Sequence, residues 1–193
     1  MMILRALSLV LLATPAVAAC PVPADMDGAG VRFTAETGDV ETFTRSADGV
    51  TQSTVESRSK PMVRAELAKG LYLTRIYDVV DGGSANEVSY SYPTALGNLP
   101  EPFAQGALTL TVEGTDDQGK FKSTETYTFG AASGLTIGTC AFEMIPVELT
   151  YAGTDQWDLF HYLPEYGLSY LAATFAADGA KTDYSFNDVM GLR

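Results

Sequence analysis

Basic residues, cysteine and histidine are all scarce in this sequence. Twelve Lys and Arg stand against 24 Asp and Glu, which gives a formal net charge of -12 at pH 7. A surface of this charge repels nucleic-acid phosphates and anionic lipid headgroups, so nucleic acid is excluded as a partner. Two cysteines and one histidine cannot form a zinc site without added carboxylates, and we predict neither a metal site nor a cofactor.

Long apolar runs are also missing beyond the start of the chain. Residues 1–18 carry Arg5 as their only charge, an apolar run over residues 6–13, and the small residues Ala16 and Ala18 before a cleavage point. This pattern is typical of an export signal, because a transmembrane helix needs about 20 apolar residues and Pro15 follows a shorter run. We predict a signal peptide over residues 1–18 and a single periplasmic domain over residues 19–193, with no transmembrane helix.

Cys20 follows the predicted cleavage point, and two interpretations compete for it. In an oxidising compartment two cysteines favour a disulfide, here Cys20 to Cys140. Alternatively, residues 17–20 fit a permissive lipoprotein signal, in which Cys20 would carry a lipid anchor. The stricter form of that signal has leucine where Val17 stands, and Pro21 is an unfavourable neighbour. We therefore predict the disulfide and keep the lipid anchor as the alternative.

Threonine, tyrosine, valine and phenylalanine recur in short alternating runs broken by Gly, Asp and Asn. A period of two is typical of antiparallel strands. The predicted strands cover residues 31–36, 40–46, 50–57, 62–68, 71–80, 107–113, 121–129, 135–137, 140–151, 157–163, 168–176 and 181–188. Residues 93–106 contain three prolines and two glycines, which predicts an irregular connection. We expect an all-β, strongly curved antiparallel sheet of about eleven strands, either a half-barrel or an open barrel.

Two features that could carry chemistry have simpler structural explanations. Residues 114–120 have the glycine and lysine spacing of a phosphate-binding loop, but Phe121 replaces the hydroxyl residue that would bind magnesium, and two aspartates would repel phosphate. We interpret this segment as a hairpin. His161 is the only histidine, and its strand places it beside apolar residues, which predicts a hydrogen-bonded core histidine rather than a catalytic base.

The densest aromatic segment of the chain runs from residue 157 to residue 175. Strand parity places Trp157, Leu159, His161 and Leu163 on one face, and Leu171 and Phe175 on one face of the next strand. Curved sheets commonly hold ligands on their concave side. We predict that these six residues form one wall of a pocket, the alternative being simple core packing.

Two segments of the sequence resemble a known family. They are residues 135–142 (LTIGTCAF) and residues 161–168 (HYLPEYGL), where Pro164 and Gly167 predict a turn before the next strand. These motifs resemble the closing half of uncharacterised periplasmic half-barrel proteins related to the LolA/LolB lipoprotein carriers. The resemblance implies a half-barrel fold and supplies no catalytic residues.

The fold that this resemblance implies leads to an expectation about function. We expect a non-catalytic periplasmic binding protein that holds an apolar small molecule, a lipid or an envelope protein on the concave face of the sheet. One alternative is an eight-stranded outer-membrane barrel, although residues 190–193 (MGLR) lack the terminal aromatic of such strands. The other alternative is a hydrolase that uses His161.

Overall fold

A computed structural model describes residues 19–193 of the chain, and the predicted export signal at residues 1–18 lies outside the described residues. Two short 3-10 helices are present, η1 (Pro23–Asp27) and η2 (Leu96–Asn98). The strands are β1 (Val31–Ala35), β2 (Val40–Arg45), β3 (Thr51–Glu56), β4 (Met62–Ala68), β5 (Tyr72–Val80), β6 (Gly83–Ser91), β7 (Gly106–Asp116), β8 (Gly119–Phe129), β9 (Ser133–Ile137), β10 (Cys140–Tyr151), β11 (Trp157–Leu163), β12 (Leu168–Phe175), β13 (Lys181–Asp183) and β14 (Phe186–Gly191). Within residues 19–193, no helix has the length and apolar character needed to cross a membrane.

All strands belong to one antiparallel sheet, which confirms the predicted fold class. Its pairing order is β13-β12-β11-β10-β8-β7-β6-β5-β4-β3-β2-β1-β14, with β9 paired to β10. Residues 19–193 form fourteen strands rather than about eleven. The sequence analysis missed β6, whose side chains are mostly polar, and it merged β13 and β14 into one strand.

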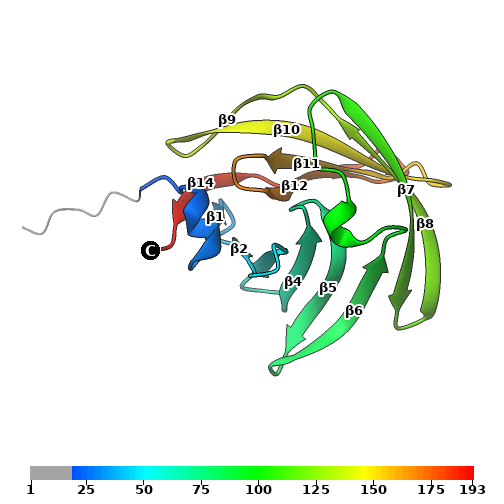
Figure 1. Ribbon diagram of the computed structural model, residues 1–193. Coiled ribbons are helices and arrows are strands. Elements are labelled where there is room, and N and C mark those ends of the chain that lie inside the picture. The colour runs from blue at the N-terminus through cyan, green and yellow to red at the C-terminus, as the bar shows by residue number, and fades with distance from the viewer. Residues whose placement is uncertain (1–18) are drawn as a thin grey trace, which may run out of the picture.

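The sheet is strongly curled but not closed (Figure 1). β13 and β14 occupy the two ends of the pairing order, yet only Tyr184 and Ser185 separate them in the chain. The amide of Tyr184 still donates to Ala172 O of β12 at 2.8 Å, and Phe186 already pairs with Ala35 of β1. Because two residues reach across, the two edges of the sheet must lie close together.

β10 connects the two parts of the curled sheet. Its first half, from Cys140 to Met144, pairs with β9, while Val147 to Thr150 in its second half pairs with both β8 and β11. As a result β9 and the start of β10 extend past the β11–β12 hairpin, and Figure 1 shows β10 above that hairpin. This geometry buries both faces of the hairpin end.

Buried side chains form two apolar clusters. The first joins η1, β1, β2, β9, the start of β10, the β11–β12 turn and β14, and includes Met26, Phe33, Phe43, Phe142, Leu163 and Tyr170. The second joins β5, β7, β8 and the end of β10, and includes Leu71, Tyr72, Val112, Tyr127, Val147 and Tyr162. The first cluster therefore joins strands from both ends of the pairing order, and the second lies among the strands of its middle.

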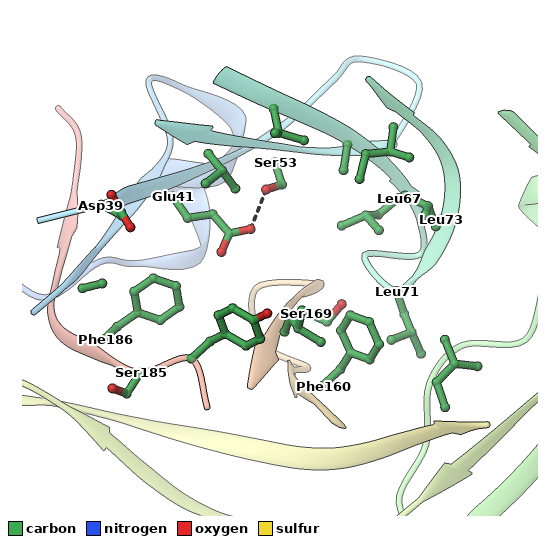
Figure 2. A pocket seen from close by; sticks show the side chains of 18 of the residues that line it. Asp39, Glu41, Ser53, Leu67, Leu71, Leu73, Phe160, Ser169, Ser185 and Phe186 are labelled. Atoms are coloured by element: carbon green, nitrogen blue, oxygen red, sulfur yellow. Dashed lines mark hydrogen bonds between the residues drawn. The ribbon is translucent and has the colours of Figure 1, made fainter. Parts of the chain in front are cut away.

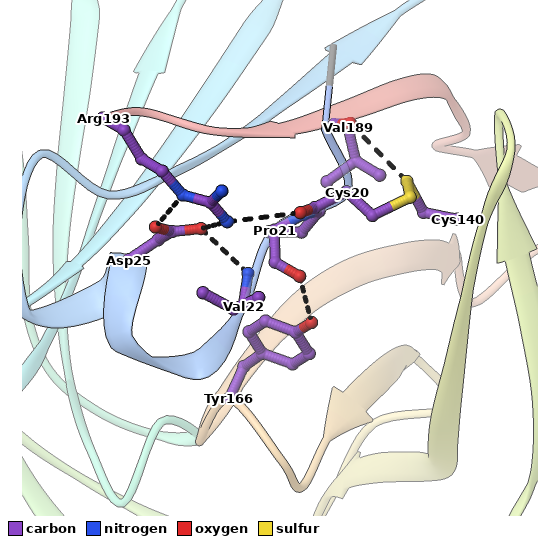
Figure 3. The surroundings of a disulfide bond; sticks show 8 residues. All are labelled: Cys20, Pro21, Val22, Asp25, Cys140, Tyr166, Val189 and Arg193. Carbon is purple, nitrogen blue, oxygen red and sulfur yellow. Dashed lines mark hydrogen bonds and ion pairs between the residues drawn. A yellow bond between two sulfur atoms is a disulfide. The ribbon is translucent and has the colours of Figure 1, made fainter. Parts of the chain in front are cut away.

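The N-terminal segment is fixed by covalent and polar contacts (Figure 3). Cys20 and Cys140 form a disulfide, which confirms the predicted pairing. A cysteine sulfur in a disulfide cannot also carry a thioether-linked lipid, so the structure disagrees with the lipid anchor. Nearby, the Arg193 guanidinium lies 2.8 Å from Asp25 Oδ1 and lowers the pKa of that carboxyl. The Tyr166 hydroxyl donates to Pro21 O at 2.8 Å.

The turn between β11 and β12 packs on the turn between β4 and β5. Pro164 begins the turn and Gly167 adopts φ +58° there. The Thr51 hydroxyl donates to Gly167 O at 2.9 Å, and the Ser169 hydroxyl donates to Gly70 O at 2.7 Å. These bonds join two strand pairs that are far apart in the sheet order and close one end of the curled sheet.

Candidate functional site

The curled sheet encloses a cavity of about 730 Å³ (Figure 2). Its wall comes from β2 to β6 on one side and from β8, β10, β11 and β12 on the other. The volume lies within the ordinary range of small-molecule sites. The cavity is therefore large enough for a single small apolar ligand.

Most of the cavity wall is apolar because cross-strand neighbours share a face of the sheet. Ala65 pairs with Ile76, Leu67 with Leu73, and Phe160 with Leu171, and all six side chains line the cavity. Leu71, Leu149 and Val55 complete this surface. An apolar guest would find contacts on both walls.

The mouth of the cavity lies at one end of the strands. The end of β13 and the connections β1–β2, β3–β4 and β13–β14 contribute lining residues there, and most of these are exposed: Glu36, Thr37, Lys60, Asp183, Tyr184 and Ser185. The opposite end is covered by the Gly70 and Gly167 turns described above. Antiparallel strands alternate in direction, so these groups of connections fall at opposite ends.

Glu41 on β2 points into the cavity near this mouth (Figure 2). The Ser53 hydroxyl of β3 donates to Glu41 Oε1 at 2.5 Å. Removal from bulk water raises the pKa of Glu41 to about 7, and the Ser53 bond only partly opposes this effect. At neutral pH the carboxyl therefore exists in comparable amounts with and without its proton.

A second carboxyl, Glu125 on β8, also lines the cavity. It is buried, and the Tyr127 hydroxyl donates to Glu125 Oε2 at 2.7 Å. Burial raises the pKa of Glu125 above its ordinary value, while the Tyr127 bond acts in the opposite direction. The cavity thus combines an apolar wall with two carboxyl groups, each of which accepts a hydrogen bond from a neutral hydroxyl group.

The structure places the six predicted pocket residues differently from the sequence analysis. Of Trp157, Leu159, His161, Leu163, Leu171 and Phe175, only Leu171 lines the cavity. β11 presents Phe160 to the cavity instead, so the neighbours of Phe160 along the strand face the other way. A register irregularity between Leu159 and Phe160 changes the alignment of β11 with β12, which the sequence does not reveal.

The remaining predicted residues pack outside the cavity. The Trp157 ring stacks on Phe175 with the ring centroids 3.6 Å apart, and Leu163 is buried in the first apolar cluster. His161 Nδ1 lies 2.8 Å from the Tyr170 hydroxyl, and burial lowers the pKa of the imidazole. The Tyr170 hydroxyl thus holds the His161 ring against β12, as expected for a hydrogen-bonded core histidine.

Glu41, Ser53 and Glu125 are site residues that the sequence analysis did not select. A signal for two of them was present. Glu41 shares strand parity with Phe43, and Glu125 shares parity with Tyr127 and Phe129, so each acid stands on an otherwise apolar face. An acid at an inward position of an amphipathic strand is costly to bury and therefore marks a candidate site.

Comparison with known proteins identified no relative of this chain. No protein-family model, no curated protein and no solved structure matches the chain.

Proposed function

We propose that this protein is an exported, non-catalytic binding protein that holds an apolar ligand inside its curled sheet. The observation that carries the proposal is the cavity of about 730 Å³ with apolar walls and one polar mouth. The half-barrel resemblance of residues 135–142 and 161–168 supports the same function. An envelope protein could deliver or receive such a ligand at the mouth.

A periplasmic location is part of this proposal. The pattern of residues 1–18 and the Cys20–Cys140 disulfide both favour an oxidising compartment outside the cytoplasm. Osmotic shock of the producing cells should release the processed protein without detergent. A protein that leaves the cells only with detergent would contradict this location and favour the outer-membrane alternative.

Binding can be tested with N-phenyl-1-naphthylamine, an uncharged dye whose emission rises in apolar surroundings. Ala65 lines the cavity, so Ala65→Trp should fill part of it and reduce dye affinity by about tenfold or more. Ala107 is exposed on β7, and Ala107→Trp is the matched control that should bind as the natural protein does. Absence of saturable dye binding, or equal loss in both variants, would contradict the proposal.

A further inference from the structure

The charges around the cavity are almost all of one sign. Within residues 19–193, five acids and one base belong to the lining: Glu36, Asp39, Glu41, Glu125 and Asp183 against Lys60. Lys60 is exposed in the β3–β4 connection at the mouth, whereas Glu41 and Glu125 lie farther inside. An anionic headgroup would meet repulsion along this path, and a cationic one would be attracted.

The acids and the apolar residues occupy different depths. β2 begins at the mouth with Val40, so Glu41 lies about 3 Å farther along the strand. Ser53 follows on β3, and Figure 2 shows Leu67, Leu71 and Leu73 on the far side of the cavity from Asp39. From the acids at the mouth through Glu41 to these leucines, this side of the lining changes from acidic to hydrophobic. This order matches a molecule with a charged head and an apolar chain.

Glu41 differs from Asp25, a buried acid outside the cavity, in what compensates its charge. Asp25 is paired with the Arg193 guanidinium at 2.8 Å. Glu41 forms no ion pair with any residue in the described part of the chain, and its hydrogen bond comes from the neutral Ser53 hydroxyl. Burying a carboxylate without a cation is unfavourable, so a cation from outside the chain would stabilise its ionised form.

A metal ion does not suit these acids. Among residues 19–193 there is no group of three or more His, Cys, Asp or Glu side chains placed to hold a metal ion. Glu41 and Glu125 come from β2 and β8, and Ser53 and Tyr127 already hold one oxygen of each. One carboxylate in a mainly apolar cavity matches a single organic ammonium group better than a multiply coordinated metal.

We propose that the ligand is a single-chain cationic amphiphile, with its ammonium group against Glu41 and its alkyl chain along Leu67, Leu71 and Leu73. The inference deepens the proposed binding function and rests on it. Glu41 accepts a charge-assisted hydrogen bond from the ammonium group, and the chain covers the apolar wall. The acidic mouth attracts the cation as it enters.

Three probes with the same chain length test the headgroup: dodecylamine, 1-dodecanol and dodecanoate, each titrated calorimetrically below its aggregation limit at pH 8. Dodecylamine should bind about tenfold or more tightly than 1-dodecanol, and dodecanoate should bind most weakly. Glu41→Gln should remove the preference for the amine and leave 1-dodecanol affinity unchanged. Glu148, an exposed acid on β10, provides the control variant Glu148→Gln, which should behave as the natural protein.

A second measurement uses the unmodified protein. The charged lining residues between Glu41 and the mouth are Asp39 in the β1–β2 connection, Lys60 and Asp183. Burial, and secondarily Glu41, raises the pKa of Tyr170 on β12. In NMR titrations of the Glu41 carboxyl carbon, the dodecylamine complex should show a lower pKa for Glu41 than the 1-dodecanol complex. An equal pKa in both complexes would overturn the inference.

The outcomes separate the inference from the function on which it rests. Equal affinity for all three probes, or tighter binding of dodecanoate, overturns the cationic headgroup while the binding function stands. If neither the probes nor N-phenyl-1-naphthylamine bind, the proposed function itself fails. A preference for the amine that Glu41→Gln leaves intact overturns the assigned role of Glu41.

Discussion

The carbonyl oxygen of Gly167 lies where a β-carbon at Gly70 would be. Gly70 has φ +69° in the β4–β5 turn, and Gly167 has φ +58° in the β11–β12 turn. An added β-carbon at residue 70 would overlap the Gly167 backbone. Glycine is therefore required at residue 70 by its conformation and also by the packing of these two turns, which close one end of the cavity.

Gly70→Ala should be the most destabilising of the glycine-to-alanine changes at positive φ. We expect a loss of about 2–4 kcal/mol in the free energy of unfolding. The alanine is strained at this positive φ, and the Gly167 backbone must also move to make room for its β-carbon. Gly153 has φ +85° with open space around it, so Gly153→Ala reports conformational strain alone, about 1 kcal/mol. Urea unfolding compares the two, and equal losses would mean that the turns do not touch.

Reduction of the Cys20–Cys140 bond should lower the unfolding midpoint. The bond joins residues 120 positions apart, and the chain-entropy estimate for such a loop is at most about 4–5 kcal/mol. Intact mass of the processed protein released by osmotic shock should show the loss of two hydrogens and no lipid. A diacylglyceryl mass on Cys20 would contradict the disulfide, and an unchanged midpoint after reduction would contradict its role in stability.

The stability of the protein should depend on pH through Glu41. The pKa of Glu41 is about 7 in the folded protein and about 4.5 as the reference for an exposed glutamate. The folded state therefore holds the proton more strongly, and this stabilisation is complete below pH 4.5 and declines as pH rises to about 7. The decline should reach about 3 kcal/mol at most.

The matched variant for this measurement is Glu41→Gln, which cannot ionise. The difference in unfolding free energy between the natural protein and this variant should change between pH 4.5 and pH 7 and stay constant above that range. Glu125 is present in both proteins, so its own raised pKa cancels in the comparison. Parallel pH profiles would show that Glu41 is accessible to bulk water.

Tryptophan emission should separate the two faces of β11. Trp157 stacks on Phe175 outside the cavity lining, so its emission should not respond to 1-dodecanol. Phe160 lines the cavity, and a protein with Phe160→Trp and Trp157→Phe should show a saturable change in emission with the same probe. A response of Trp157 alone would mean that the ligand binds on the opposite face.

The strand pattern of this protein is largely a property of its sequence, because side-chain alternation and turn residues act locally. Residues 107–113 and 121–129 alternate clearly, and β7 and β8 include them. β6 was missed although Asp81 and Gly82 form a turn with φ +50° and +79° before it. Its polar side chains and the positive φ of Asn86 remove the alternation on which the prediction depended.

Contacts between residues far apart in the sequence could be predicted only where covalent chemistry left few possible partners. With two cysteines and a predicted export signal, Cys20 and Cys140 could be paired from the sequence alone. The approach of Gly70 to Gly167 and the contact of Arg193 with Asp25 depend on how the whole sheet curls. Residue spacing carries no information on that curvature, since it accumulates over many strand pairs.

The sequence by itself determined the all-β class, most strands and the disulfide, since each follows from local periodicity or from the small number of cysteines. The tertiary structure decided which face of each strand became the interior. Alternate residues of β11 face opposite sides, which turned Phe160 toward the cavity and left Trp157 and His161 outside it, and the register irregularity that leaves Ala172 of β12 unpaired put Leu171 and Phe175 on opposite faces. A change of one residue in register reverses the face of every following side chain, so the cavity and its acids emerged only from the folded sheet.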